Sequence, residues 1–501
     1  MGKFTFIDLF AGIGGFRMAL ERNGGKCIGF SEINNDAIEY YCRNYNEDKS
    51  ENFGDITKIK SLPNHDILVG GVPCQSWSIA GRNLGFDDDR GQLWNDTIYL
   101  LNQSRPKAFI FENVKGLTDP RNKTALQYIL NRIKEAGYSA DYFVINSADY
   151  GVPQNRVRVY IIGFSDENNF NVFNVFKIIH QYSQSKATLA DVLGIKRNEN
   201  NQEGIETDLF GSPISRAKMS LSTTNGFNDY FLFNDLRNGH STIHSWDILE
   251  TTPHQKEICL TLLKNRRKSK YGNLDGNPLS LQHFQEIMPN VTQNDIDDLI
   301  EKEILKPENY LFKISDYSNE NLTKEETIIV SKVKKNIINI DELKADRKFK
   351  INKIDIQKTI NLLLGKRVLE CIEIRYDFKN TKISTGLFGV NRIFLPTSDI
   401  FPTLVASDTN DFITTEKIET QNEEDFKKIF IEEIYKKGKY RRITKEEACV
   451  IQGLPEDFEL PENRAKWMKL VGNSVSVPVI EVLIKSIIDT EVFEMDKDLV
   501  C

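Results

Sequence analysis

Residues 4–15 read FTFIDLFAGIGG, an apolar run that ends in a glycine-rich turn. The run predicts a buried β-strand, and the apolar spacing over residues 16–22 predicts a helix directly after the turn. A strand, a glycine turn and a helix let backbone N–H groups approach a ligand closely. A second apolar stretch, residues 27–31, ends at Glu32, which suits an acidic residue that binds ribose hydroxyls.

The glycine turn departs from the dinucleotide fingerprint, because Arg17 stands where the third glycine is expected. An adenosine-containing cofactor other than a nicotinamide dinucleotide is therefore favoured. The alternative interpretation is a tight turn that binds no ligand, since this pattern alone is weakly specific.

Two further apolar runs end in chemically reactive side chains. Residues 66–69 lead into Gly-Gly-Val-Pro and then Cys74, and residues 109–111 lead into Glu112. In a parallel α/β sheet, ligands bind beyond the carboxyl ends of the strands, so these two side chains are expected to converge there. A thiol beside a carboxyl group predicts covalent catalysis. The alternative is a small buried cysteine and a surface glutamate.

Taken in chain order, these segments resemble the C5-cytosine DNA methyltransferase family, from Phe6 to about Phe164 and from Arg392 to about Leu483. Any one motif arises by chance, but the complete ordered set is very specific. The matching stretches are residues 8–15, Pro73-Cys74-Gln75, Glu112-Asn113-Val114, Gln154 with Arg156 and Arg158, residues 441–455, and Gly472-Asn473-Ser474-Val475.

The resemblance implies an α/β fold, namely a Rossmann-like S-adenosylmethionine-dependent methyltransferase domain with a large inserted target-recognition domain of mixed α/β structure. The expected limits are residues 1–170 for the catalytic and cofactor-binding domain and 171–391 for the target-recognition domain. Residues 392–440 form the return segment, and residues 441–501 carry the C-terminal motifs and a helix that completes the catalytic domain. A chain of 501 residues agrees with more than one domain.

The resemblance also assigns catalytic roles. Cys74 is expected to attack C6 of cytosine, and Glu112 to contact N3 and the amino group of the base as an acid. Arg158 is expected to contact the base carbonyl oxygen, and Arg156 to support the active-site loop. For the two arginines, the alternative is phosphate contact or surface ion pairing.

Cofactor contacts follow from the same comparison, with S-adenosylmethionine as the expected cofactor. Phe10 is expected to stack on the adenine, although packing in the core is the alternative for this ring. The other expected contacts are Glu32 with the ribose, Asp55 and Ile56 with the adenine, and Gly12, Gly14 and Asn473 with the methionine end.

The expected partner is double-stranded DNA, from which the target base must be flipped. Because the net charge is −7, only local positive patches are expected to bind the DNA. Residues 78–93 resemble the loop of the family that closes on DNA. Expected DNA contacts are Gln75, Ser78, Arg82, Arg90 and Thr403, together with Arg266, Arg267, Lys268 and Lys270 of the strongest basic run. No metal site is expected, because the acidic run at residues 87–89 lacks the spaced ligands of a calcium loop.

The region between residues 164 and 391 carries no family motif, and no internal repeat is evident in it. Apolar spacing predicts helices over residues 279–287, 292–304 and 354–368, and alternation predicts a strand over residues 369–378. Helix, helix and hairpin is the order of a winged helix, which lays one helix in the major groove. An ordinary α/β insertion that packs on itself is the other interpretation, and the sequence slightly favours it.

The function implied is a DNA (cytosine-5-)-methyltransferase, the modification partner of a restriction endonuclease, expected as a monomer in the cytoplasm. The seven cysteines form no Cys-x-x-Cys pair, and neither a signal peptide nor a membrane-spanning apolar run is evident. The alternatives are an RNA (tRNA) cytosine-5 methyltransferase and a non-catalytic DNA-binding regulator that retains the fold. Intact Cys74, Glu112 and Arg158 argue against the regulator.

Overall fold

The computed structural model describes residues 3–73, 89–173, 187–195, 228–315, 321–332, 335–346, 349, 351, 354–420 and 422–494. The chain forms two compact units. The first combines Met1–Tyr230 with Phe394–Cys501, and the inserted unit is Phe231–Ile393. The chain thus crosses from one unit to the other later than residue 171, and the limits predicted for the target-recognition domain stay a prediction.

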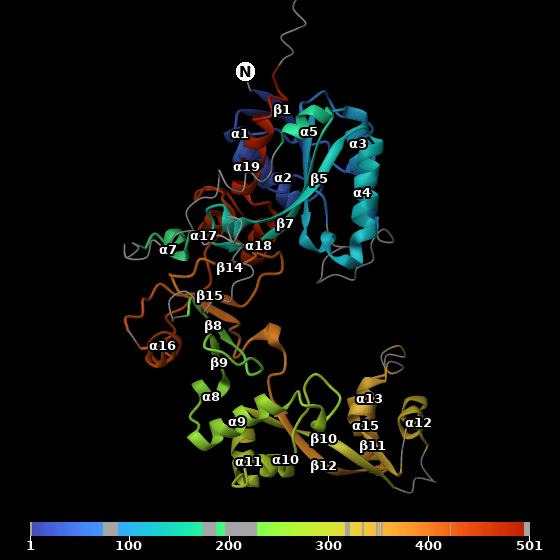
Figure 1. Cartoon of the computed structure of the whole chain (residues 1–501), viewed down its shortest axis with the longest axis vertical. Helices are drawn as coiled ribbons and strands as arrows, with labels where there is room; N and C mark the ends of the chain where they lie inside the picture. Colours follow the sequence, from blue (N-terminus) through green and yellow to red (C-terminus); the bar gives the residue numbers. More distant parts are fainter. Residues whose placement is uncertain are drawn as a thin grey trace, which may run out of the picture. The chain divides into compact units, whose positions relative to one another are not determined.

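A six-stranded sheet forms the centre of the first unit, in the order β2-β1-β3-β4-β7-β5 (Figure 1). Its strands β1 to β4 run parallel, and β7 is antiparallel to both of its neighbours. This topology is the predicted α/β fold. The strands are β1 (Phe4–Leu9), β2 (Gly25–Ser31), β3 (Ile67–Gly71), β4 (Ala108–Val114), β5 (Ser139–Asn146) and β7 (Val157–Phe164).

Helices cover both faces of this sheet because the strand residues alternate between two hydrophobic clusters. In β1, Phe4 and Phe6 face the cluster that contains the C-terminal helices, whereas Ile7 and Leu9 face the other. The helices of the first unit are α1 (Gly15–Arg22), α2 (Asn35–Tyr45), α3 (Asp89–Ser104), α4 (Lys123–Glu135), α5 (Glu167–Val172), α7 (Leu189–Val192), α16 (Glu423–Ile429), the π-helix Phe430–Tyr435, α17 (Lys445–Gln452), α18 (Arg464–Asn473) and α19 (Val477–Ile488).

The end of the chain packs against its beginning. Helix α19 lies against α1, and Arg22 Nη1 is 2.8 Å from Glu481 Oε1.

The helical stretch Arg464–Ile488 has a mean hydropathy of 1.5 in its most apolar window, enough by composition for a membrane span, which the sequence did not lead us to expect. Because 72% of that window is buried inside the protein, it serves as a core helix of the first unit.

Short strands bring the return segment back to the first unit. β14 (Phe401–Pro402) pairs in parallel with β6 (Gln154–Asn155). In the chain, β13 (Arg392–Phe394) precedes β14, and β15 (Asp411–Ile413) follows it.

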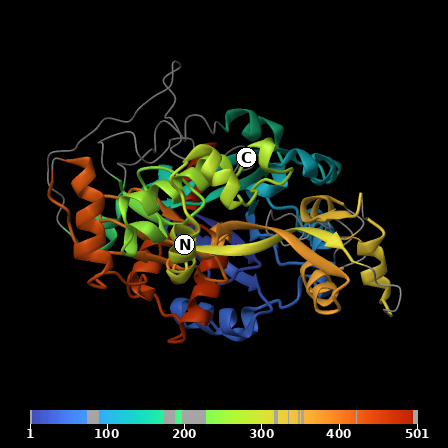
Figure 2. The same ribbon diagram turned by 90° about the horizontal axis from the view of Figure 1, so that it is seen from below.

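The inserted unit is built on a long antiparallel hairpin of β10 and β12, which lie side by side in Figure 2. Strand β11 extends this sheet in the order β11-β10-β12. Its elements are β8 (Tyr230–Phe233), β9 (Thr242–Ile243), α8 (Ser245–Ile248), α9 (Pro253–Asn265), α10 (Leu281–Ile287), α11 (Gln293–Glu301), β10 (Leu305–Ile314), α12 (Lys324–Val330), β11 (Ile337–Asn339), α13 (Ile340–Ala345), α15 (Ile356–Gly365) and β12 (Leu369–Phe378).

The three helices and the strand that the sequence predicts for this unit are confirmed. Helices α10, α11 and α15 lie within the three predicted helical stretches. Strand β12 covers the predicted residues 369–378 from end to end.

The glycine turn after β1 offers a direct test of this packing. Gly14 has a φ of 85°, and a Cβ built on it would lie 2.4 Å from Cε2 of Tyr45. Gly12 has a φ of 56°, but a Cβ there meets nothing within 4 Å. We expect Gly14→Ala to lower the free energy of unfolding by about 1–3 kcal/mol more than Gly12→Ala does, because only the former adds a clash to the backbone strain. Urea unfolding of both variants measures this, and equal losses would contradict it.

Candidate active site

The turn after β1 projects backbone groups beyond the carboxyl end of the sheet. Phe10 adopts a left-handed φ of 52° and is half-buried against the second hydrophobic cluster. The N–H of Gly12 donates to Oε2 of Glu32 at 2.8 Å, which ties the turn to the end of β2. The glycine turn and the predicted ribose-binding carboxylate therefore lie together.

Backbone groups hold the Glu32 carboxylate in place. Its other oxygen, Oε1, accepts from the N–H groups of Ile33 and Asn34, each at 2.8 Å. The side chain of Asn52 accepts from the Glu32 N–H and donates to the Glu32 carbonyl, both at 3.0 Å. Glu32 is thus fixed by contacts on both its backbone and its side chain.

The predicted adenine-binding pair follows the same edge of the sheet. The Asp55 carboxylate accepts from the backbone N–H and hydroxyl of Thr57, and these hydrogen bonds lower the pKa of Asp55. Ile56 is buried. Added Cβ atoms at Gly12 and Gly54 meet nothing within 4 Å, so neither glycine is covered by other described residues on that side. These residues fit a nucleoside-containing cofactor.

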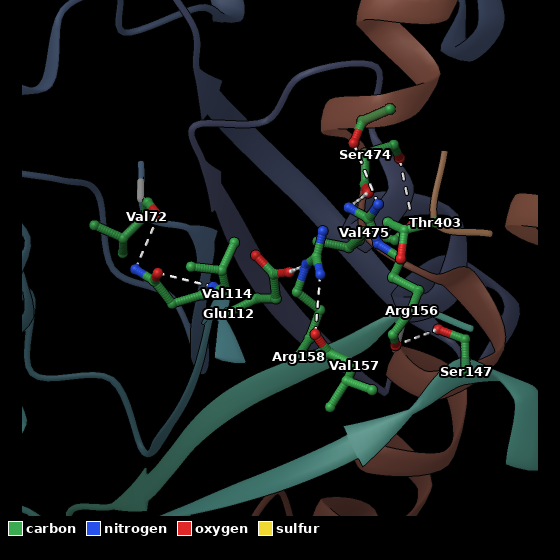
Figure 3. A network of polar contacts seen from close by, with 12 residues as sticks. Val72, Glu112, Val114, Ser147, Arg156, Val157, Arg158, Thr403, Ser474 and Val475 are labelled. Atoms are coloured by element: carbon green, nitrogen blue, oxygen red, sulfur yellow. Dashed lines mark hydrogen bonds and ion pairs between the residues drawn. The ribbon is translucent and has the colours of Figure 1, made fainter. Parts of the chain in front are cut away.

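Glu112 and Arg158 form an ion pair at the ends of adjacent strands (Figure 3). Arg158 Nε lies 3.0 Å from Glu112 Oε1, and both side chains are largely buried. The N–H does not point at this oxygen with hydrogen-bond geometry, so Oε1 has no hydrogen-bond donor among the described residues. Glu112 is therefore a charge-paired carboxylate with an oxygen left to accept a hydrogen bond.

Asn113 connects this carboxyl group to the neighbouring strand end. Its Nδ2 donates to the carbonyl of Val72 at 3.2 Å, and the Val72 N–H donates to the Glu112 carbonyl at 3.2 Å. Val72 is the second residue before Cys74, so Asn113 anchors the start of the predicted nucleophile loop. Asn113 belongs to the Glu-Asn-Val motif but had no predicted role, although a polar residue directly after an apolar run was a usable signal.

Arg156 is buried and cross-links three chain segments (Figure 3). Its Nη1 donates to the carbonyls of Leu404 and Gly472, both at 3.2 Å, and its Nη2 donates to the carbonyl of Ser474 at 2.6 Å. Gln154 adds a hydrogen bond to Gln452 at 3.0 Å. In this structure Arg156 therefore positions segments of the first unit, and its expected support of the active-site loop stays a prediction.

Comparison with known proteins identifies the family. The model of the C-5 cytosine-specific DNA methylases matches residues 4–273 and 258–489. The chain belongs to this family. It is 39% identical to the Type II methyltransferase M.HgiBI of Herpetosiphon aurantiacus over 500 residues, 99% of each chain. It is 29% identical to the Type II methyltransferase M.BanI of Aneurinibacillus aneurinilyticus, over 98% of this chain and 97% of that one. Among solved structures, the Entamoeba histolytica methyltransferase EhMeth aligns over 97% and 98% of the two chains at 14% identity and a TM-score of 0.47.

Several residues predicted for this methylase site lie outside the described ranges, namely Cys74, Gln75, Ser78 and Arg82. Arg90 belongs to the first turn of α3. Asn473 is exposed at the end of α18, and the Thr403 hydroxyl donates to the Asn155 carbonyl at 2.5 Å. Their expected roles with cofactor and DNA stay predictions.

The basic run of the inserted unit divides into one buried residue and its exposed neighbours. Both carboxylate oxygens of Asp377 accept from Arg266 Nη2, at 2.9 and 2.8 Å, and the Arg266 side chain is only 9% exposed. This corrects the expectation that Arg266 contacts DNA, because its guanidinium is committed to a buried carboxylate. Arg267, Lys268 and Lys270 are exposed and remain predicted DNA contacts.

Substitutions of Arg266 and Arg267 distinguish the buried arginine from the exposed one. We expect Arg266→Ala to destabilise the inserted unit by about 3–5 kcal/mol, because it leaves the Asp377 charge buried without its partner. Arg267, whose side chain is 68% exposed, is the matched control, and Arg267→Ala leaves the unfolding transition in place. Thermal unfolding of the two variants is the measurement, and an unchanged Arg266→Ala transition would refute the structural role.

Proposed function

We propose that this protein is a DNA (cytosine-5-)-methyltransferase of a Type II restriction-modification system, which methylates a flipped target cytosine. The Glu112–Arg158 pair, held beside the Val72 backbone that leads to Cys74, carries the proposal. Family membership and the names of the full-length relatives support it. The proposed cellular partner is a restriction endonuclease, and we propose that the enzyme acts as a cytoplasmic monomer.

S-adenosylmethionine is the proposed cofactor and supplies the methyl group when bound. The uncovered Gly12 and Gly54 and the Glu32 carboxylate, which is fixed by hydrogen bonds, support this assignment. Glu32 would hold the ribose hydroxyls, and Phe10, Asp55 and Ile56 would contact the adenine. Gly12, Gly14 and Asn473 would line the methionine end.

The nucleophile compensates for the low reactivity of cytosine C5. The Cys74 thiolate gives its electron pair to C6 and forms a C–S bond, while the ring electrons move toward C5. C5 then takes the methyl group, and the electrons of the broken S–CH3 bond stay on the sulfur of the donor. A base, which water can provide, takes the C5 proton; the electrons of the C–H bond return to the ring, and the C–S bond breaks to free the thiolate. A free cysteine has a pKa of about 8.5, so positive charge near Cys74 would favour the reactive form.

Glu112 and Arg158 stabilise the addition step. A protonated Glu112 would hydrogen-bond N3 and offset the charge that develops when the thiolate adds. The oxygen of Glu112 that lacks a donor, Oε1, is an available group for this contact. Arg158 would donate to the base carbonyl oxygen, which its position 3.0 Å from Glu112 Oε1 supports.

An RNA substrate is the main alternative, and a direct comparison decides between the two. Purified enzyme is supplied with labelled S-adenosylmethionine and either plasmid DNA or transfer RNA. Label in DNA alone is expected, and label in RNA alone would replace the DNA assignment. A protein that labels neither, yet binds DNA, would be the non-catalytic regulator.

The nucleophile assignment predicts the effect of one substitution. Cys74→Ala should abolish methyl transfer and leave the binding of S-adenosylmethionine and DNA largely intact, because the thiol acts in the chemical step. DNA with 5-fluorocytosine at the target should trap the wild-type enzyme covalently, since fluorine does not leave as a proton does. Denaturing electrophoresis detects the adduct, and Cys74→Ala is its control. Substantial turnover by this variant would exclude the mechanism.

Two glutamates distinguish chemistry from cofactor binding. Glu112→Gln should lower the methylation rate by roughly 10²–10⁴ while the dissociation constant of the cofactor stays the same. Glu32→Ala should weaken cofactor binding, because it removes the carboxylate that joins the glycine turn to β2. Single-turnover kinetics and titration calorimetry give the two quantities. A Glu112→Gln variant whose main defect is cofactor affinity would show that the roles are misassigned.

A further inference from the structure

The inserted unit contains an internal repeat about its central hairpin. Strands β10 and β12 each have ten residues and begin at Leu305 and Leu369, which are 64 positions apart. Their register is reciprocal, because Leu305 pairs with Phe378 and Ile314 pairs with Leu369. The hairpin therefore has a pseudo-twofold axis through its middle, which the sequence analysis did not detect.

The helices that precede these strands end alike. Glu303 and Arg367, again 64 positions apart, both have a left-handed φ of 59° between helix and strand. The Ile304 carbonyl accepts from the N–H of Lys379, and the Val368 carbonyl accepts from the N–H of Ser315, each at 2.9 Å. Helix α11 is thus equivalent to α15.

A contact made by a partly exposed lysine is also repeated. Lys302 donates to the Glu250 carbonyl and to Oε1 of Gln255, the capping-box residue of α9. Its equivalent Lys366 donates to the Asn321 carbonyl and to Oε2 of Glu326, the capping-box residue of α12. In each half, then, a lysine at the end of the third helix joins it to the start of the first.

Each half has the helix and strand order of a winged helix. The first half runs α9, a bridge residue, α10 and α11 before the hairpin, and the bridge joins Leu279 to Tyr376. The second runs α12, β11, α13 and α15, and β11 pairs Ile338 with Phe312. The halves share β10 and β12, each serving as a wing strand of both. In this fold the third helix, here α11 or α15, is the one that enters the major groove.

The two third helices carry opposite charge. Residues 293–303 hold five carboxylates and one lysine, whereas residues 357–367 hold two lysines and an arginine with no carboxylate. At equivalent exposed positions, Asp297 faces solvent where the second half has Asn361, and Asp298 where it has Leu362. DNA phosphates repel the first surface and attract the second.

We propose that the inserted unit is a duplicated winged helix in which α15 alone reads the major groove of the target DNA, while α11 is a structural counterpart kept off DNA by its carboxylates. The inference rests on the proposed DNA substrate. An asparagine amide matches the adenine edge, and an apolar side chain contacts the thymine methyl group, so Asn361 and Leu362 are suited to base contact. Lys358 and Arg367 flank them and are exposed for phosphate contact.

Matched substitutions on the two helices test the proposal in the full-length enzyme. Asn361→Ala with Leu362→Ala is compared with Asp297→Ala with Asp298→Ala at the equivalent positions. Each enzyme is expressed with a plasmid that carries a randomised insert, and bisulfite sequencing reports which cytosines are methylated and in what context. The α15 variant should lower methylation of the wild-type motif about ten- to a hundredfold and accept other bases at one or more positions. The α11 variant should keep both motif and rate.

A second pair of substitutions addresses phosphate contact. Lys358→Ala with Arg367→Ala should weaken binding to any duplex, and the log–log salt slope should become shallower by about one unit per lost contact. Unchanged thermal unfolding and cofactor affinity confirm that each variant is folded. A motif altered by the α11 variant, or retained by the α15 variant at full rate, overturns the assignment. A wild-type enzyme that methylates no duplex would instead overturn the proposed function.

Discussion

The guanidinium group of Arg156 is the contact on which the divided first unit depends. The inserted unit separates β7 from the return segment in sequence, and Arg156 reconnects them by donating to the carbonyls of Leu404, Gly472 and Ser474. A buried charge is costly unless hydrogen bonds compensate it, so these three carbonyls and the guanidinium fix one another. The strand that carries Arg158 is thereby held to the C-terminal motif whatever sequence fills the insertion.

Two hydrogen bonds link the candidate acid, Glu112, to the loop that leads to the candidate nucleophile, Cys74. Glu112 and Asn113 are consecutive, and both bond to the backbone of Val72, one through its carbonyl and the other through its side chain. A shift at the end of β4 therefore moves the start of the loop that leads to Cys74. The ion pair between Glu112 and Arg158 extends this coupling to β7. The ends of β3, β4 and β7 are thereby held in position relative to one another.

Sequence patterns predicted the features that local chemistry determines. Alternation located β12, and an apolar run followed by a charged residue located Glu112 at a strand end. A run of basic residues does not reveal which member meets a carboxylate far along the chain, so the burial of Arg266 against Asp377 was missed. The repeat was missed because its halves share mainly apolar positions, helix ends and one lysine, which are visible only once β10 and β12 are paired.

The shared hairpin has a consequence for how the inserted unit folds. Neither half contains a complete sheet of its own. Strand β10 follows the helices of the first half and pairs with β12, which follows all the helices of the second half in the chain. During synthesis, the edge of β10 that pairs with β12 stays unpaired until residue 378 has been made, and an unpaired strand edge favours association with other chains. The two halves must therefore fold together in one cooperative step, rather than independently and one after the other. Pairing β10 with β12 carries the entropic cost of closing the long connection between them.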